Sequence, residues 1–145
     1  MMIIKAELRH AAEVAAIERE CFHDPWPQDL IERWITGEDK RFLVCVDEHG
    51  TVLGYIGAQT VLDEGYIGNV AVTHAARRQG AGRALVEAMA SEARRDGLAF
   101  LTLEVRAQNA AGRELYENCG FVEVGVRRGY YDKPPDDAVL MTLYL

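Results

Sequence analysis

The spacing of the apolar residues changes across residues 77–82, and this change limits the folds that the chain can adopt. Before this segment, residues 66–72 read as a β-strand. From it to about Arg95, apolar residues recur every three or four positions, as in an amphipathic helix; they are Ala81, Ala84, Leu85, Ala88 and Met89. Gly97 can end that helix, and residues 100–106 form a second strand. This order predicts a crossover with parallel strand pairing.

The rest of the chain extends this unit into a mixed sheet. In the first expected helix, residues 10–22, apolar residues recur at helical spacing, and three charged residues are expected on its other faces: Glu13, Glu18 and Arg19. Further helices are expected over residues 28–35 and 109–118, and further strands over residues 3–7, 42–47, 51–62, 121–127 and 138–145, with turns at 63–65 and 133–137. The sequence predicts an α/β fold, a mixed sheet of about seven strands with helices on both faces. The length of 145 residues predicts one domain over 1–145.

The charge balance bears on possible partners. There are 16 Lys and Arg residues against 23 Asp and Glu residues, a net charge of −7. Phosphate binding along nucleic acid needs a basic face, so the acidic balance argues against direct nucleic-acid binding. It allows a cationic small molecule or a basic peptide as partner. Solubility alone explains the negative charge equally well.

The cysteines and the hydropathy pattern narrow the class of protein further. Cys21, Cys45 and Cys119 contain no C-x-x-C pair, which argues against a disulfide framework or a zinc ribbon. No apolar stretch approaches the roughly 18–20 residues of a membrane helix, and the start of the chain lacks the pattern of a secretory leader. We expect a soluble cytoplasmic protein with no metal and no membrane contact.

A glycine-rich segment joins the expected strand at residues 66–72 to the expected helix that ends near Arg95: Arg77-Arg78-Gln79-Gly80-Ala81-Gly82-Arg83. The first amides of a helix lack partners within the helix and mark the positive end of its dipole. Such a start binds phosphate, and the two glycines let a pyrophosphate approach the backbone. The segment is neither a P-loop nor the dinucleotide fingerprint. A plain glycine turn that opens a helix is the alternative.

Gly68 lies inside the preceding strand and is followed by Asn69-Val70-Ala71-Val72. A glycine inside a strand indicates a bulge or a close approach of another backbone. A bulge would free N–H and C=O groups of Val70 and Val72 to pair with an extended ligand. A slightly weakened core strand explains the glycine equally well.

Glu104 is an acid inside an apolar strand. Three apolar residues share one face of that strand, and Thr102 and Glu104 share the other. A carboxylate in a central parallel strand should be desolvated, so it needs a partner or a task. An ion pair with Arg106 or Arg127 is the alternative to a catalytic role.

The last expected helix offers a second candidate for proton transfer. Asn109 is expected to cap this helix, and Gly120 to end it. Tyr116 lies about two turns from its start, where it can face the core or the ends of the strands. A tyrosine packs more often than it acts as an acid, so packing is the alternative here.

Together these residues resemble the GNAT superfamily of acetyl-CoA-dependent N-acetyltransferases. The Arg77-x-x-Gly80-x-Gly82 element is similar to the family's pyrophosphate motif and follows a strand, as the family requires. Agreement is closer with one branch, the RimI-type ribosomal-protein alanine N-acetyltransferases. The similar stretches run across nearly the whole chain: Trp26, Val61-Leu62-Asp63-Glu64, Asn69-Val70-Ala71-Val72, Leu103-Glu104-Val105-Arg106, Asn109, Leu115-Tyr116-Glu117, Gly120-Phe121, Arg127-Arg128-Gly129-Tyr130-Tyr131 and Asp136-Asp137-Ala138.

The resemblance implies a GNAT fold and acetyl-CoA as the acetyl donor. Val70, Ala71 and Val72 would hold the pantetheine arm by backbone hydrogen bonds, with the acetyl group near Val70. The pyrophosphate would lie on Arg78, Gln79, Gly80, Ala81, Gly82 and Arg83, and Asn109 would bind the pantetheine region. Glu104 matches the family's general base and Tyr116 its general acid. Gln108 and Gly112 depart from the branch, which has serine and alanine there, and neither change removes a group that the mechanism needs.

The acceptor implied by the branch is the N-terminal alanine of a small-subunit ribosomal protein, whose basic tail would suit an acidic enzyme. Its contacts are expected at Trp26, Glu64, Tyr130 and Tyr131, with Asp63, Asp136 and Asp137 in flanking turns. Solvated turns and aromatic core packing are the alternatives for these residues. Because no cysteine nucleophile is required, we expect the amine to attack the thioester directly in a ternary complex.

Two other classes of function remain open. One is a small-molecule N-acetyltransferase that acts on an amine such as a polyamine or an aminoglycoside. The other is a module that binds acetyl-CoA without turnover. The presence of both Glu104 and Tyr116 disfavours the second class.

Overall fold

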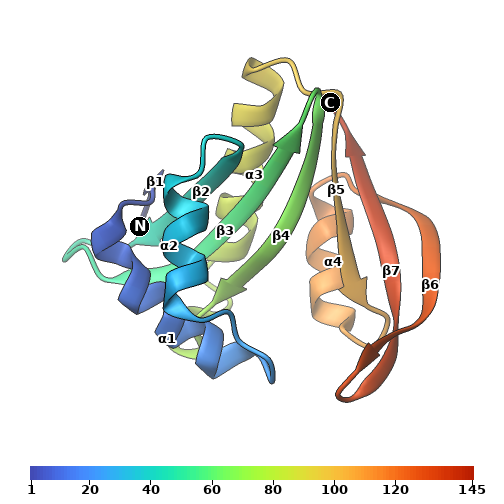
Figure 1. Ribbon diagram of the computed structural model, residues 1–145, viewed down its shortest axis with the longest axis horizontal. Helices are drawn as coiled ribbons and strands as arrows, with labels where there is room; N and C mark the ends of the chain where they lie inside the picture. Colours follow the sequence, from blue (N-terminus) through green and yellow to red (C-terminus); the bar gives the residue numbers. More distant parts are fainter.

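The computed structural model describes residues 1–145 and contains a seven-stranded mixed sheet in the order β1-β2-β3-β4-β5-β7-β6 (Figure 1). Only β4 and β5 pair in parallel, as the predicted crossover requires. The strands are β1 (Met2–Lys5), β2 (Lys40–Val46), β3 (Val52–Val61), β4 (Glu64–Val72), β5 (Phe100–Arg106), β6 (Val122–Asp132) and β7 (Pro135–Tyr144). The helices are α1 (Ala11–Cys21), α2 (Gln28–Thr36), α3 (Ala81–Arg95) and α4 (Ala110–Asn118), with the 3₁₀ turns η1 (Leu8–His10) and η2 (His74–Ala76).

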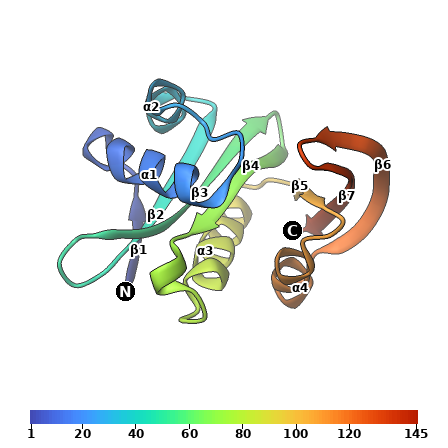
Figure 2. The same ribbon diagram turned by 90° about the horizontal axis from the view of Figure 1, so that it is seen from below.

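The helices form a layer on each face of the sheet (Figure 2). α1 and α2 cover β2, β3 and β4 on one face, called here the α1 face, and α3 and α4 cover the other, called the α3 face. Each face has its own core. The α3 face buries Leu85, Met89 and Leu101, and the α1 face buries Val14 and Ile31. The predicted α/β class, the seven strands and the helices on both faces are confirmed.

The parallel pairing of β4 and β5 is short. It joins residues 64–66 to residues 100–102. Beyond these pairs the two strands diverge (Figure 1), so the second half of β4 pairs only with β3 and the second half of β5 only with β7. The sheet therefore contains a gap in its hydrogen bonding between residues 67–72 and residues 103–106, called here the β4–β5 opening.

The bulge indicated by Gly68 is present in β4. Asn69 lies opposite Gly57 on β3, and Ile67 lies opposite Ala58. Two consecutive residues of β3 thus face three residues of β4, and Gly68 is the additional one. The bulge lies at the level of the β4–β5 opening, directly before the segment predicted to bind a ligand.

Two turns are tighter than the sequence predicted. β4 begins at Glu64, which pairs with Val61 across a two-residue turn in which Leu62 adopts a φ of 55°. β6 and β7 also pair almost to their tip, where Asp132 faces Pro135. In both places the strand pairing continues through polar residues, which the sequence pattern assigned to the turns.

Two further observations concern the helices and the thiols. No helix has both the length and the apolar character needed to cross a membrane. The three cysteines are free, and Cys45 is fully buried in the core, as its apolar surroundings in the sequence predict.

Candidate active site

The start of α3 presents backbone donors that have no partner within the helix. Gly80 precedes the helix with a φ of 84°, a left-handed conformation that glycine adopts without strain. No side chain caps this end, and the first helical hydrogen bond runs from Ala84 N–H to the Gly80 carbonyl. The N–H groups of Ala81, Gly82 and Arg83 are therefore available, at the positive end of a 15-residue helix. These donors fit an anionic ligand such as a pyrophosphate.

The arginines around this segment add less free charge than the sequence suggested. Arg77 turns back toward β4, where its Nε donates to the Val72 carbonyl at 3.3 Å. Arg83 forms an ion pair with Glu87, with 2.7 Å between Nε and Oε1. Residues 78–79 are exposed. The backbone amides, more than the guanidinium groups, are the donors of this site.

The backbone of β4 directs alternate residues toward β3 and toward the β4–β5 opening. Thr73 N–H donates to β3 at 2.8 Å, whereas the Val72 carbonyl accepts from the side chain of Arg77. Backbone direction alternates along a strand, so Val70 shares the direction of Val72, and Ala71 that of Thr73. Val70 and Val72 therefore direct their N–H and C=O groups to the opening, where an extended ligand can pair with them.

Asn109 caps α4, as predicted. Its Oδ1 accepts a hydrogen bond from Gly112 N–H at 2.9 Å. A Cβ on Gly112 would lie 2.6 Å from Asn109 Nδ2, so glycine at this position lets the asparagine side chain fold over the start of the helix. The cap uses only the oxygen of the amide, and the Nδ2 donor remains for a ligand.

Glu104 lies on the α1 face of β5, since Leu103 and Val105 on either side of it belong to the α3-face core. The expectation that this carboxylate is desolvated was wrong: 29% of the side chain is exposed. The physical reason is the β4–β5 opening, which leaves Glu104 paired to β7 alone. The predicted alternative, an ion pair, is present, with 3.6 Å between Glu104 Oε1 and Arg127 Nε.

Tyr116 lies on the opposite side of the sheet from Glu104. It is buried in the α3-face core, with its ring 5.8 Å from that of Phe121. Burial raises the pKa of its hydroxyl above the ordinary value for tyrosine, so the group keeps its proton. The predicted base, Glu104, and the predicted acid, Tyr116, thus lie on different faces of the sheet.

Trp26 lies in the loop between α1 and α2, on the α1 face. Its ring packs on that of Trp34, with centroids 4.8 Å apart. A Cβ on Gly68 would lie 2.8 Å from Trp34 and 3.1 Å from Trp26. The glycine of the bulge therefore makes room for both indole rings against β4.

Tyr130 and Tyr131 lie together near the end of β6. Their rings meet edge to face, with centroids 5.0 Å apart, and the guanidinium group of Arg106 lies 4.1 Å from the Tyr131 ring. A hydrogen bond with the Glu104 carboxylate raises the pKa of Tyr130. Tyr130 is thereby brought next to the candidate base, and it is half exposed.

The acidic residues expected around the acceptor have different surroundings. Glu64 begins β4 on the α1 face, next to its short pairing with β5. Asp136 accepts a hydrogen bond from Gln108 N–H at 3.1 Å, and Asp137 accepts one from Gly129 N–H at 2.8 Å. The two aspartates therefore hold the β6–β7 hairpin and its neighbouring loop in shape. They are half-buried in β7 and not part of a solvated turn, as the sequence alternative had it.

Glu18 was assigned to an outer face of α1, and that assignment was wrong. Its side chain is fully buried. Its Oε1 accepts hydrogen bonds from Tyr55 Oη and from Asn69 Nδ2, both at 2.7 Å. The sequence carried a signal for this position, because Glu18 follows Val14 by four residues and so lies on the apolar side of the helix.

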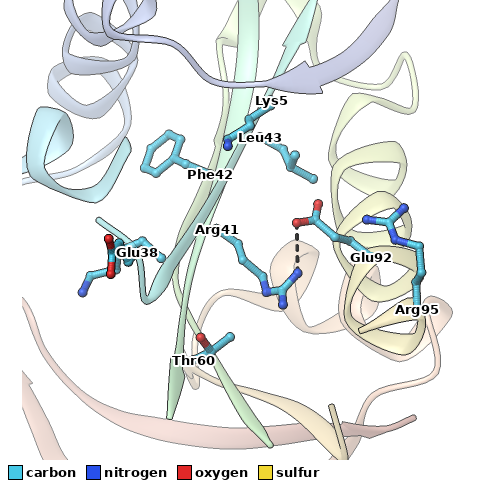
Figure 3. Close-up of a pocket in the computed structure, with 9 residues that line it drawn as sticks. Lys5, Glu38, Arg41, Phe42, Leu43, Thr60, Glu92 and Arg95 are labelled. Atoms are coloured by element: carbon cyan, nitrogen blue, oxygen red, sulfur yellow. Dashed lines mark hydrogen bonds and ion pairs between the residues drawn. The ribbon is translucent and has the colours of Figure 1, made fainter. Parts of the chain in front are cut away.

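A cavity of about 420 Å³ lies away from these residues, between the start of β2 and the C-terminal part of α3 (Figure 3). Arg41 at its wall bonds to Glu92 at 3.0 Å and to Asp96 at 2.6 Å. Glu92 is about 16 Å along the helix from Ala81 at 1.5 Å per residue, so this ion-paired cavity is separate from the start of α3. No group of three or more His, Cys, Asp and Glu side chains is arranged to hold a metal ion.

Comparison with known proteins gives a consistent result. The [ribosomal protein bS18]-alanine N-acetyltransferase of Escherichia coli K12 is 38% identical over 130 residues, 88% of this chain and 86% of that protein. The Haemophilus influenzae protein of the same name is 34% identical over 133 residues, 89% and 88% of the two chains. The crystal structure of the Escherichia coli ribosomal-protein-S18-alanine N-acetyltransferase matches with a TM-score of 0.91 at 35% identity and covers 99% of this chain and 92% of that one.

The match to a family model covers helices α1 to α4 and the candidate site. Residues 11–121 match the Acetyltransferase (GNAT) family, a range that includes the start of α3, the β4 bulge, Glu104 and Tyr116. The chain therefore belongs to the GNAT family and is an acetyl-CoA-dependent N-acetyltransferase.

Proposed function

We propose that this chain is a single-domain cytoplasmic enzyme that acetylates the N-terminal alanine of a small-subunit ribosomal protein by direct transfer in a ternary complex. The names of the relatives support the acceptor class, since they act on the alanine of ribosomal protein bS18. The observation that carries the reaction is that Glu104 lies on the α1 face of β5 beside the β4–β5 opening, whereas Tyr116 is buried in the core of the opposite face. The acceptor amine would then reach Glu104 from one face while the thioester reaches Tyr116 from the other.

The residues around the opening fit acetyl-CoA, which when bound would supply the acetyl thioester. The free N–H groups at the start of α3 would hold the pyrophosphate, within Arg78, Gln79, Gly80, Ala81, Gly82 and Arg83. The backbone of Val70, Ala71 and Val72 would hold the pantetheine arm, and Asn109 Nδ2 would donate to it. The Val70 N–H would then face the acetyl carbonyl, where a fixed donor stabilises developing negative charge.

Glu104 would accept a proton from the acceptor amine at a carboxylate oxygen, directly or through water. An α-amino group has a pKa of about 7.7–8.0, so much of it is protonated near neutral pH and must lose that proton before attack. The partial exposure of Glu104 lets an incoming amine reach it. Arg127 and Tyr130 would hold the carboxylate in position.

Tyr116 would hold a proton at Oη for the leaving sulfur. Because burial raises its pKa, the hydroxyl remains protonated until a strong base appears beside it, as a departing thiolate would. Burial also raises the pKa of the thiols of Cys21 and Cys119. Neither cysteine is therefore activated as a nucleophile, which supports direct transfer.

The acceptor peptide would enter on the α1 face, between the loop that carries Trp26 and the hairpin that carries Tyr130 and Tyr131. Glu64 lies on the same face and would attract a basic residue of the peptide. The net charge of −7 favours a basic ribosomal tail over an acidic one.

A substrate panel tests this proposal. Synthetic peptides that share a basic tail and differ only in the first residue are assayed with acetyl-CoA beside free polyamines and aminoglycosides. The peptide that begins with alanine should have the highest kcat/KM. A higher value for a free amine would instead support a small-molecule N-acetyltransferase, and no turnover of any amine would support a binding module.

A further inference from the structure

Glu18 is a buried acid for which the proposed reaction has no use. Its side chain is fully buried in α1, and its Oε2 atom has no hydrogen-bond partner. Burial raises the pKa of this carboxyl group. Replacing a buried ionic group by an apolar one of similar volume is often neutral or stabilising. Stability alone therefore does not explain an acid at this position.

The contacts of Glu18 connect it to the bulge. Its Oε1 accepts from two donors at 2.7 Å, Tyr55 Oη on β3 and Asn69 Nδ2 on β4. Asn69 directly follows Gly68, and both residues face α1 and α2. The Asn69 side chain reaches Glu18, and a Cβ added to Gly68 would meet Trp34. Two consecutive residues on one face of a strand are the local signature of the bulge.

The bulge sets the direction of the backbone that follows it. Without the additional residue, every later position of β4 would shift by one. The N–H of Val70 would then point to β3 instead of to the β4–β5 opening. The hydrogen bond from Asn69 to Glu18 ties the residue that directly follows the additional one, Gly68, to α1.

We infer that Glu18 is a positioning residue: through Asn69 it holds the β4 bulge, and thereby directs the Val70 N–H into the β4–β5 opening. This inference rests on the proposed role of Val70 at the acetyl carbonyl. Glu18 itself touches neither acetyl-CoA nor the acceptor. It requires only an acceptor oxygen at position 18 and a donor at position 69.

Three variants separate this role from a structural one. Asn69→Leu removes the donor and keeps the approximate volume. Tyr55→Phe is the matched control, because it removes the other hydrogen bond to the same oxygen without touching the bulge. Glu18→Gln keeps an acceptor oxygen for both donors and changes only the atom that has no partner. It is the conservative variant that should preserve function.

The experiment combines NMR amide exchange of the free protein with calorimetric binding of acetyl-CoA and of CoA. Asn69→Leu should speed exchange of the amides at positions 69 and 71, which face β3. It should also reduce the preference for acetyl-CoA over CoA by about three- to tenfold, the effect of one lost hydrogen bond, while CoA affinity stays within about twofold. Tyr55→Phe should lower Tm but keep the wild-type preference, and Glu18→Gln should keep both the preference and the slow exchange.

Equal effects of Asn69→Leu and Tyr55→Phe on exchange and preference would overturn the inference, as would slow exchange at positions 69 and 71 in Asn69→Leu. Loss of the preference in Glu18→Gln would overturn the requirement for an acceptor oxygen. A wild-type protein that binds both ligands equally would instead contradict the role of Val70 in the proposed function, whatever the exchange rates show.

Discussion

Arg127 Nε lies 3.6 Å from Glu104 Oε1. Arg127 belongs to the outer strand β6 and Glu104 to β5, and β7 lies between these strands. The pair therefore bridges β7 on the α1 face, and the same carboxylate raises the pKa of Tyr130 on the outer strand. The β6–β7 hairpin thus holds the carboxylate of the candidate base in place.

Glu104→Gln keeps the size of the side chain and removes its ability to accept a proton. If Glu104 is the general base, kcat/KM should fall by about 10²–10⁴, the usual contribution of such a group. The acidic limb of the profile of kcat/KM against pH should flatten. Steady-state rates across pH with an alanine-first peptide provide the measurement.

Arg127→Gln is the control for the ion pair. It keeps the carboxylate and removes its charged partner, so its effect on kcat/KM should be clearly smaller than that of Glu104→Gln. If Glu104 is only an ion-pair partner, both variants should lose similar small amounts of stability, on the order of 1 kcal/mol for a partly exposed pair. Turnover per folded molecule would then stay near normal in both.

Tyr116→Phe preserves the ring that packs against Phe121 and deletes only the hydroxyl. A group that protonates the leaving sulfur acts mainly in the transition state, so kcat should fall while the affinity for acetyl-CoA stays roughly constant. The loss should be smaller with an acetyl thioester of a more acidic thiol, since that leaving group needs less help. Equal losses for good and poor leaving groups would mean that Tyr116 only orients the donor.

Gly82→Val tests the anion site at the start of α3. The added methyl groups would occupy the space through which a phosphate approaches the free amides, so acetyl-CoA affinity in calorimetry should fall at least tenfold. A Cβ added at this position would lie 3.3 Å from Leu115 Cδ2 on α4. Gly82→Ala therefore serves as the control for a steric contact with α4 alone. Unchanged affinity in a folded Gly82→Val protein would rule out this site.

Glu18→Gln should change the pH dependence of stability. Burial raises the pKa of Glu18, so the native state binds a proton there more tightly than the unfolded chain, whose pKa is about 4.3. Its contribution to stability is complete below that pH and is lost as the pH rises through the native pKa. Glutamine does not titrate. In urea titrations the free energy of unfolding of Glu18→Gln should therefore rise relative to that of the wild type as the pH increases above about 4. A difference that stays constant with pH would contradict this prediction.

The fold was predictable because its signals are local. The change from strand to helix spacing at residues 77–82 predicts the crossover, Gly68 predicts the bulge, and Asn109 predicts a cap. The structure contains all three. Such features depend on neighbouring residues, so a single sequence can carry them.

The surroundings of the acids were not predictable in the same way. Glu104 was expected to be desolvated, but parallel pairing stops two residues before it and leaves it partly exposed. Glu18 was expected on an outer face, but Tyr55 and Asn69 from two other strands bury it. The exposure of Glu104 depends on how far β4 and β5 stay paired, which the spacing along one segment does not show. For Glu18 the helical spacing did indicate the apolar side of α1, but its two partners come from distant strands.

The most direct test of the proposed reaction is to locate the acetyl group on an intact ribosomal protein. Ribosomal protein bS18 with a free N-terminal alanine is incubated with the chain and acetyl-CoA, and the product is fragmented in a mass spectrometer. The account predicts one acetyl group on the α-amine of the alanine, formed at a rate that Glu104→Gln reduces by about 10²–10⁴. Acetylation of lysine side chains alone, or an unmodified protein under conditions in which a free polyamine is acetylated, would contradict it.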